Sequence, residues 1–481
     1  MSTATNGSRV KSSRQTGRKN TETNGKRFDW PLAHEAETLL RRRMDSFLAA
    51  NSFARELAAR MQSETGTDFF EWMDHLVLDP SEESSLIAAG FVEDSSSETP
   101  KGERVFEQPR ATLPRVLLRR GKTNPSTIAL RPEFVAEFVA SHHLTHTIEG
   151  EPCSRYRRVL VSEENGTRLE AVERRAYRGF VPAKLKSNEL RNVVQARELW
   201  KTRPRRFLND VDGFKVARKI LKNSFELVGR DLSCQFFFEA ERAYWENRNR
   251  AGRLQKHRQD QLGLGWGNHD HHTFRCSREH FVDLIDILVK LGFEKRERYY
   301  AGAEAGWGAQ ISEQWVTGIV VFADVDLQPD ETHIDFSRLK LPPAPRLGTV
   351  GLWTGLHGES FLQAGMHHLE ARFEFDLLRE QLLQNGVSVM KSFSDFDFLR
   401  QAFTEGERWP VRRERAERLL ADGLITREQC DQFIREGAIG SHLENLQRHG
   451  GFKGFNQKSV SVVIAATDPR RDHFAHTTTT R

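Results

Sequence analysis

The chain has 481 residues, of which 38% are apolar and 29% charged, as in a globular protein with room for two or three domains. No apolar run approaches the about 20 residues that cross a membrane, and no signal-peptide core lies near the start, so no membrane protein is expected. The four cysteines lie far apart in the sequence. This spacing argues against a zinc finger or a disulfide framework and favours a reducing, cytoplasmic location.

The net charge of +5 comes from the first 27 residues. Residues 1–27 hold seven Lys or Arg and a single acid, Glu22, so the rest of the chain is close to neutral. This segment is rich in Ser, Thr, Asn and Gly and cannot bury a core, so we expect a disordered basic tail. A solubilising or unprocessed N-terminus is expected there, with nucleic-acid binding as a minor alternative. Residues 469–481 are expected to form a second disordered tail.

Residues 28–260 predict an N-terminal α+β region. Apolar residues recur at helical spacing from residue 39 to residue 61. Three strand patterns follow, at 71–78, 115–118 and 156–161. Residues 187–258 then predict highly charged helices, with the three phenylalanines at 236–238 as their main core contact.

Several histidines of this region are weighed as metal ligands. His75 follows Asp74 on a predicted strand, but no arginine stands four residues later, so a structural role is expected. His142, His143 and His146 lie at a predicted helix end. Their spacing is not the i, i+4 pair with a Glu that zinc proteases use, so no metal site is expected there.

Residues 268–275 read Asn-His-Asp-His-His-Thr-Phe-Arg and predict a strand that directs imidazoles and a guanidinium into one pocket. Alternate side chains share one face of a strand. One face is therefore expected to carry His269, His271, Thr273 and Arg275, and the other His272 and Phe274.

An amphipathic helix follows this strand. Ser277 is placed at its N-cap, its apolar residues run from Phe281 to Leu291, and Gly292 ends it. Strands over 295–300 and 318–324 complete a first module, which spans 261–341.

A second module, 346–468, repeats this order after a stiff Pro-rich linker. Residues 366–373 alternate like a strand, and helical spacing follows from Phe375 to the Asn-Gly pair at 385–386. A helical insertion is expected over 392–437 and a closing strand over 460–466. His271 and Arg275 are four residues apart, and so are His368 and Arg372. The two copies of His-x-x-x-Arg predict paired modules that close over a common metal.

Two histidines from different strands and one carboxylate form the facial triad that holds non-haem Fe(II) and leaves three positions open. Zn²⁺, Mn²⁺ and Co²⁺ accept the same ligands. The third ligand stays open among Glu444, Glu359, which is expected to share a strand face with His357, and Gln457. An arginine beyond each histidine supplies a planar fork for a substrate carboxylate.

Four segments of the chain resemble a known family. His271-His-Thr-Phe-Arg275 and His368-Leu-Glu-Ala-Arg372 are similar to the two histidine strands of the 2-oxoadipate dioxygenase/decarboxylase (2-hydroxyglutarate synthase) family, which belongs to the vicinal-oxygen-chelate type metalloenzymes. Tyr299-Tyr300 resembles the Tyr-rich turn of that family, and residues 444–450 loosely resemble its Glu-x-Glu-Gln-Arg-Gly segment. The resemblance covers about 264–450.

The resemblance implies an α+β fold in which paired βαβββ-like modules form a cupped or barrel-like sheet surrounded by helices. It implies a Fe(II) dioxygenase that decarboxylates a small 2-oxo acid such as 2-oxoadipate with O₂. His271, His368 and Glu444 would then hold the metal. Arg275, with Tyr300, would bind the distal carboxylate of the substrate, and Arg372 would be a second catalytic arginine or would brace the fold.

Two alternatives remain at this stage. One keeps the modules but uses Zn²⁺, Ni²⁺ or Mn²⁺ for glyoxalase-like isomerase or lyase chemistry. The other is a non-catalytic small-molecule binding protein that has lost its third ligand. The sequence makes no prediction of the oligomeric state.

Overall fold

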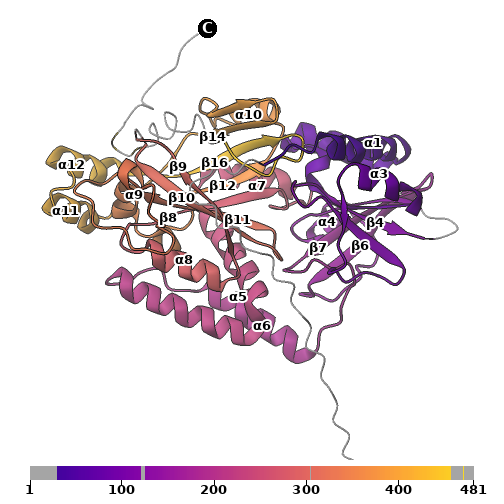
Figure 1. Cartoon of the computed structure of the whole chain (residues 1–481), viewed down its shortest axis with the longest axis horizontal. Coiled ribbons are helices and arrows are strands. Elements are labelled where there is room, and N and C mark those ends of the chain that lie inside the picture. The colour runs from indigo at the N-terminus through magenta and orange to yellow at the C-terminus, as the bar shows by residue number, and fades with distance from the viewer. Residues whose placement is uncertain (1–29, 121–124, 304, 457–467, 469, 471–481) are drawn as a thin grey trace, which may run out of the picture.

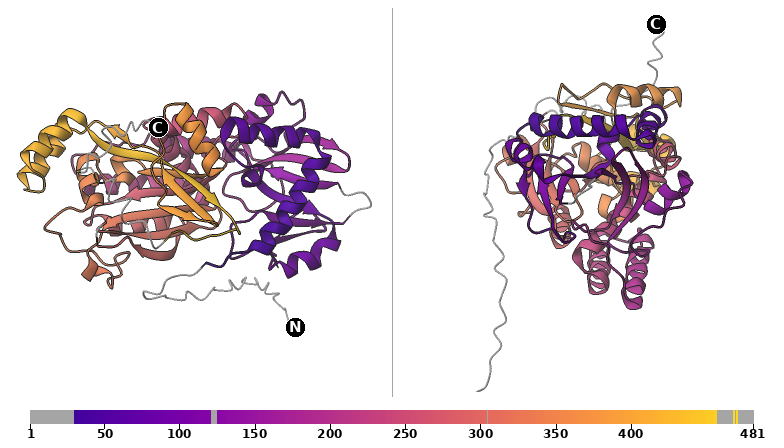
Figure 2. Two further views of the ribbon diagram at one scale, coloured as in Figure 1. Left: turned by 90° about the horizontal axis from the view of Figure 1, so that it is seen from above. Right: turned by 90° about the vertical axis from the view of Figure 1, so that its right-hand side faces the viewer.

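The computed structural model describes residues 30–120, 125–303, 305–456, 468 and 470. In this part of the chain two mixed β-sheets lie side by side, each with helices packed on it (Figure 1, Figure 2). The N-terminal sheet is indigo to purple in the figures, and the C-terminal sheet runs from pink to yellow. The predicted tail at 1–27, Gln457 and the predicted strand 460–466 lie outside the described residues, as does all of the second tail except Arg470.

The N-terminal sheet has the order β2-β3-β4-β1-β5-β7-β6. Its strands are β1 Met73–Leu78, β2 Val92–Glu93, β3 Glu103–Glu107, β4 Arg115–Arg119, β5 Ser126–Leu130, β6 Tyr156–Glu164 and β7 Thr167–Arg174. The helical segments of this region are α1 His34–Ala50, α2 Ser52–Arg60, η1 Met61–Thr65, η2 Phe69–Trp72, η3 Pro80–Glu82, α3 Glu83–Ala88 and α4 Val135–Ser141. The expected helical stretch over 39–61 and the three expected strands are therefore present.

Three long helices connect the two sheets: α5 Ser187–Lys201, α6 Asp210–Glu246 and α7 Arg250–Asp260. Helix α6 is interrupted at Gly229, whose φ of 77° is outside the helical range. Phe237 stacks on Phe274 and Phe361 of the C-terminal half, so these helices share the hydrophobic core of the second sheet. The expected core role of the three phenylalanines is confirmed.

The second sheet has the order β13-β14-β16-β12-β8-β11-β10-β9. The first module consists of β8 His269–Arg275, α8 Phe281–Lys290, β9 Glu294–Tyr300, β10 Trp307–Gln314 and β11 Ile319–Asp326. The second consists of β12 His368–Arg372, α10 Phe375–Gln384, β13 Ser394–Phe396, β14 Leu399–Phe403 and β16 Ala438–Arg448. In each, the first strand runs parallel to the last, and β8 and β12 meet antiparallel at the centre. The expected α+β class with paired βαβββ modules is confirmed.

The elements between and beside the modules are η4 Pro329–Glu331, α9 Thr349–His357, η5 Ser360–Ala364, β15 Glu407–Trp409, α11 Arg413–Ala421 and α12 Arg427–Glu436. The expected helical insertion over 392–437 is wrong in its first half, because β13, β14 and β15 form there. Leu399 and Phe403 are buried where β14 pairs with β16, and this long-range pairing outweighs local helical spacing.

Two local expectations around β8 are wrong. The pairing of β8 with β12 shifts register between His271 and His269, so Asp270 forms a bulge and alternation fails there. The ring of His269 consequently lies 5.3 Å from that of His272, away from the face of His271. Helix α8 has His280 rather than Ser277 at its N-cap, and Ser277 Oγ accepts a hydrogen bond from the His280 backbone at 3.4 Å.

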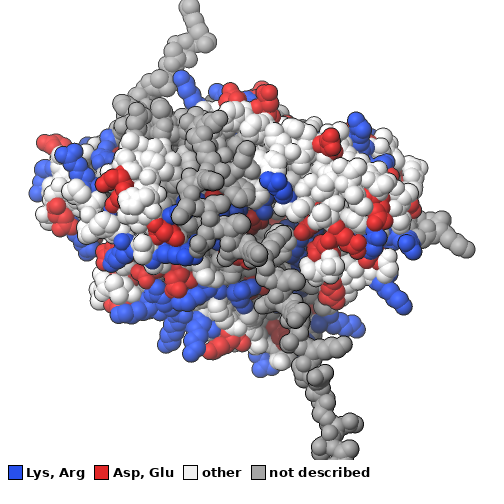
Figure 3. Space-filling model, viewed as in Figure 1, with Lys and Arg blue, Asp and Glu red and all other residues white. Residues whose placement is uncertain are grey.

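The surface of the molecule carries mixed charge. Figure 3 shows Lys and Arg interspersed with Asp and Glu, with Lys and Arg gathered along the lower edge, where α6 exposes Lys215, Lys219 and Lys222. Within the described part of the chain, no helix combines the length and the apolar character needed to cross a membrane.

Candidate metal centre

Three neighbouring strands bring the predicted metal ligands together. His271 lies on β8, His368 on β12 and Glu444 on β16. In the observed register His271, Glu370 and Glu444 form a row across the sheet. His368 precedes Glu370 by two residues and therefore shares its strand face. All four side chains are buried.

The donor atoms of the three predicted ligands converge. His271 Nε2 lies 3.4 Å from His368 Nε2 and 3.7 Å from Glu444 Oε2, and His368 Nε2 lies 3.0 Å from Glu444 Oε2. Ligands held at about 2.1 Å from a metal and at right angles to one another are about 3 Å apart. Two imidazoles and one carboxylate at these separations therefore fit a single metal ion such as Fe(II).

Glu370 is a further site residue that the sequence analysis missed. Its Oε1 lies 2.7 Å from His271 Nδ1, and the amide of Gln401 donates to both Glu370 Oε2 (2.8 Å) and Glu444 Oε1 (3.1 Å). A carboxylate on the second ring nitrogen fixes the orientation and tautomer of a metal-binding histidine. Strand alternation could have found Glu370, because it follows His368 by two positions.

The proton occupancy of the site follows from burial and from these carboxylates. Burial disfavours the charged imidazole, but Glu370 and Asp270 outweigh burial and raise the pKa of His271 to about 9. Burial, reinforced by Glu370 and Asp270, raises the pKa of Glu444 well above its ordinary value. Burial also lowers the pKa of His368. Without a metal, His271 therefore holds a proton at neutral pH while His368 is neutral.

Asp270, His271 and Glu370 form a second group of converging acids and imidazole. Its charge is already balanced by arginines. Arg448 lies 2.9 Å from Asp270 and 3.6 Å from Glu370, and Arg372 lies 3.1 Å from Asp270. The group around His368 and Glu444 has no such cations within ion-pair distance among the described residues, so it is the better metal site.

A small cavity of about 60 Å³ opens beside the donor atoms. Its wall is largely aromatic and comprises Tyr299, Trp307, Phe322, Phe393, Phe403 and Phe455. Arg275 and Asp324 also line it. The Nε and Nη1 groups of Arg275 are buried without a hydrogen-bond partner among the described residues, which leaves donors for a bound anion. Burial raises the pKa of Asp324 to about 7.

Three other predicted site residues lie outside this cavity. Tyr300 is adjacent to Tyr299 on β9 and so points to the opposite face, among the core residues of α8 and β11. Arg372 pairs with Asp270 and with Glu71 at 3.4 Å. Glu359 follows helix α9 rather than lying on a strand, and it accepts hydrogen bonds from the Ser277 backbone.

Three further histidines among the described residues have structural partners. His75 Nδ1 lies 2.7 Å from Asp74, and His142 Nε2 lies 3.0 Å from the carbonyl of Leu262. His367 Nδ1 lies 3.0 Å from His368 Nδ1, on the side of the ring away from Glu444. His367 therefore supports the orientation of His368 as Glu370 supports that of His271.

The strand order gives a fold of paired βαβββ modules, as expected from the resemblance to the vicinal-oxygen-chelate type, with a candidate metal centre where the modules meet. No protein-family model matches the sequence, and comparison with curated proteins gives no significant match.

Comparison with solved structures gives weak likenesses. A triple mutant of 4-hydroxymandelate synthase from Streptomyces coelicolor is 12% identical over 84% of this chain and 99% of that one, with a TM-score of 0.28. Methylmalonyl-CoA epimerase from Mycobacterium tuberculosis is 12% identical over 38% of this chain and 88% of its own, with a TM-score of 0.22. A xylose isomerase-like TIM barrel/4-hydroxyphenylpyruvate dioxygenase fusion protein is 10% identical over 84% of this chain and 52% of its own, with a TM-score of 0.23. Likenesses at this level carry no argument about function.

Proposed function

We propose that this protein is a Fe(II)-dependent dioxygenase that decarboxylates a small 2-oxo acid such as 2-oxoadipate. The observation that carries the proposal is the convergence of His271 Nε2, His368 Nε2 and Glu444 Oε2 within 3.0–3.7 Å beside a small cavity. Two imidazoles and one carboxylate leave further coordination positions open for a chelating substrate and O₂.

The protein residues have separate tasks in this proposal. His271, His368 and Glu444 hold the metal, and Glu370 keeps the proton on His271 Nδ1 so that Nε2 faces the ion. Bound Fe(II) would supply redox activation of O₂ and electrophilic activation of the 2-oxo acid. The aromatic wall excludes water from the reacting groups.

Arg275 binds the distal carboxylate of the substrate. Its guanidinium lines the cavity, and no carboxylate lies within 4 Å of it among the described residues. Burial lowers the pKa of Arg275 only to about 10, so the group stays charged at neutral pH. A planar guanidinium can donate two parallel hydrogen bonds to a carboxylate. We assign Arg372 to positioning, because it holds Asp270, which lies 3.7 Å from His271 Nδ1.

Anaerobic loading with Fe(II), followed by an oxygen-uptake screen across 2-oxo acids of increasing length, tests the proposal. We expect stoichiometric iron binding and oxygen consumption with release of one CO₂ per substrate. Iron binding without oxygen consumption by any 2-oxo acid would contradict the dioxygenase and favour isomerase or lyase chemistry. A chain that takes up no metal would favour a binding protein.

Single substitutions at the centre sharpen this test. We expect His271→Ala, His368→Ala and Glu444→Gln each to abolish iron binding and activity while the protein stays folded by circular dichroism. His146→Ala is the matched control, because His146 is exposed and outside the cluster. Full activity in both histidine variants of the centre would refute the site.

Arg275→Gln is expected to raise KM for the dicarboxylic 2-oxo acid by about tenfold or more, since it removes a charge-assisted hydrogen bond. KM for a 2-oxo acid without a distal carboxylate should change far less. An equal change for both substrates would assign Arg275 to the fold rather than to substrate recognition.

A further inference from the structure

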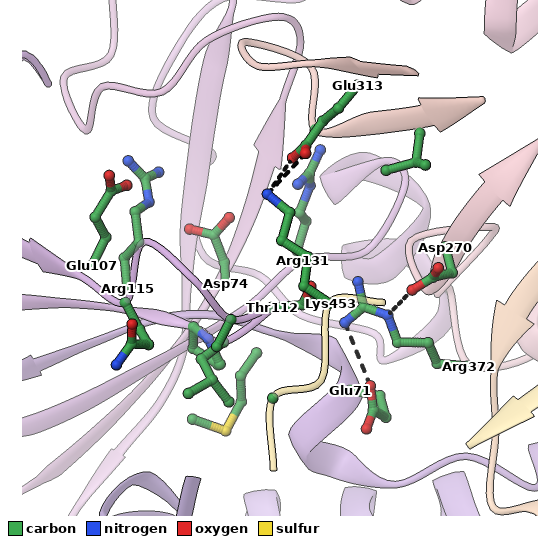
Figure 4. A pocket seen from close by; sticks show the side chains of 18 of the residues that line it. Glu71, Asp74, Glu107, Thr112, Arg115, Arg131, Asp270, Glu313, Arg372 and Lys453 are labelled. Atoms are coloured by element: carbon green, nitrogen blue, oxygen red, sulfur yellow. Dashed lines mark hydrogen bonds and ion pairs between the residues drawn. The ribbon is translucent and has the colours of Figure 1, made fainter. Parts of the chain in front are cut away.

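A second and larger hollow lies where the N-terminal sheet faces the metal-binding sheet. This interdomain cleft has a volume of about 280 Å³ and is lined by residues of both sheets (Figure 4). It is separate from the cavity of the metal centre, although Phe322 contributes to both walls.

The cleft has an excess of positive charge. Its lining contains eight Lys or Arg and six Asp or Glu. Six of the cations have a carboxylate partner: Arg174 with Asp74, Arg178 with Glu107, Arg296 with Glu297, Arg372 and Arg448 with Asp270, and Lys453 with Glu313. Figure 4 draws the ion pairs of Arg372 and Lys453 as dashed lines.

Arg115 and Arg131 are the two cations of the cleft without a carboxylate partner among the described residues. Arg115 is held by hydrogen bonds to the Arg178 carbonyl (2.7 Å) and Ser97 Oγ (3.3 Å) and stacks on Phe180. Arg131 has no side-chain hydrogen bond to any described residue and lies on the segment that follows β5. Both side chains are only partly buried, so their guanidinium groups can donate hydrogen bonds to an anion that enters the cleft.

Burial and neighbouring arginines lower the pKa of both guanidinium groups. Burial and the nearby Arg174 lower the pKa of Arg115 to about 9. Burial lowers the pKa of Arg131, and Arg174, Arg372 and Arg242 add to the effect, whereas Asp74 opposes it. A negative charge bound in the cleft would offset the repulsion that each group feels from neighbouring arginines.

We propose that the interdomain cleft is a second ligand site, which binds a small organic or inorganic anion through Arg115 and Arg131. The ligand carries a phosphate or a carboxylate group, since a guanidinium donates paired hydrogen bonds to either. The site is independent of the metal and of the dioxygenase activity proposed above.

Calorimetric titration of the metal-free protein with orthophosphate and, separately, with glutarate tests the site at 0.15 M NaCl. We expect saturable one-to-one binding of at least one probe, and the tighter probe identifies the anionic group. Arg131→Gln and Arg115→Gln should each weaken that binding about tenfold or more. Arg131→Lys, which keeps the charge but loses the fork, should fall between the wild type and Arg131→Gln.

Arg206→Gln is the matched control, because Arg206 is exposed and remote from the cleft lining. It should leave binding unchanged, and so should His271→Ala, which destroys the metal centre. Since the Arg131 side chain has no hydrogen-bond or ion-pair partner among the described residues, Arg131→Gln should not lower Tm in the absence of ligand. No saturable binding of either probe, or binding that survives both cleft substitutions, would overturn the proposal.

Discussion

His271 uses both nitrogens of one ring, and the two nitrogens have different tasks. Nε2 faces His368 and Glu444, whereas Nδ1 lies 2.7 Å from Glu370. In the proposed centre the same imidazole would thus offer one nitrogen to the metal while the other lies at ion-pair distance from a carboxylate. The strength and the pH dependence of metal binding should therefore both depend on Glu370.

Replacing the carboxylate of Glu370 tests its role in orientation. Glu370→Gln should lower the affinity for divalent metal by about 10–100-fold, because the ring of His271 loses its charged partner. Competition against a chromophoric chelator measures the effect. Gln401→Ala serves as a comparison, since Gln401 contacts both Glu370 and Glu444 but not His271. Unchanged metal affinity in Glu370→Gln would show that this carboxylate does not orient His271 for metal binding.

Metal affinity should rise with pH. His271 is protonated below its pKa of about 9, and the metal binds only the neutral Nε2, so binding releases at least one proton. The apparent affinity for Co²⁺ is expected to increase at least tenfold per pH unit between pH 6 and 8. In Glu370→Gln the increase in Co²⁺ affinity should level off at a lower pH than in the wild type, because His271 loses a carboxylate that raises its pKa. A flat profile in the wild type would contradict the assigned protonation.

Two of the site residues could be predicted from the sequence, and a third could not be fixed. His271 and His368 each stand on an alternating strand before an amphipathic helix, which is a local signal. Glu444 could not be separated from Glu359 by local pattern, because its place beside Glu370 depends on the parallel pairing of β12 and β16. Asp270 was assigned to neither face of its strand, and the β-bulge that it forms depends on the pairing of β8 with β12.

At the scale of elements, β16 is the strand that completes the centre, and its packing depends on a glycine. A Cβ on Gly440 would overlap the indole of Trp409. That indole is fixed because its Nε1 donates to the Arg248 carbonyl at 2.8 Å and its ring lies under the Arg248 guanidinium. The close approach lets β16 run from Ala438 to Arg448 past its partner strand β15.

Gly440→Ala should therefore lower the free energy of unfolding by about 1–3 kcal/mol, the usual cost of overpacking. Metal affinity should fall with it, because β16 carries Glu444. Denaturant unfolding and metal titration measure the two effects. Gly423→Ala is the control. A Cβ on Gly423 would meet open space, so the substitution should cost only about 1 kcal/mol, which comes from the left-handed backbone conformation of this residue. Equal stability of the two variants would contradict the packing argument.

The elements with strong local periodicity were predictable, and those formed by pairing were not. Helix α8 and helix α10 each bury one apolar stripe and follow directly from spacing. The short strands β13 and β15 have three residues each, and their register comes from neighbours far along the chain. His357 and Glu359 were expected to share a strand face, but His357 ends helix α9, whose buried apolar residues have no clear period.

At the scale of the whole molecule, α1 contacts the segment after β16 and so links the two ends of the described chain. Glu37 accepts hydrogen bonds from Arg41 Nε (2.7 Å) and from the backbone of Gly451 (2.8 Å). No sequence pattern predicts this contact, because more than 400 residues separate Glu37 and Gly451.

The Glu37 contact makes the stability of the molecule sensitive to acid. Burial alone would raise the pKa of Glu37, but His449, Arg41 and the Gly451 amide lower it to about 2. A carboxyl group whose pKa is lower in the folded than in the unfolded chain stabilises the fold at pH values above its unfolded-state pKa. This contribution is lost as the pH falls from about 4.5 to about 2.

Glu37→Gln should reduce the free energy of unfolding by about 2–3 kcal/mol at pH 7. The difference from the wild type should shrink between pH 4.5 and 2. Urea unfolding across this range measures it, and the exposed Glu35→Gln is the control. A difference that does not depend on pH would mean that packing, rather than charge, is lost.

The position of the donor atoms has a consequence for biogenesis. His271 and His368 are 97 residues apart and sit on the two antiparallel strands through which the modules join. A nascent polypeptide offers only one imidazole until the second module has been synthesised, and the carboxylate of β16 arrives later still. If the proposed centre binds its metal, loading with the ion would therefore be a late maturation step, and the bound ion would tie the modules together against separation.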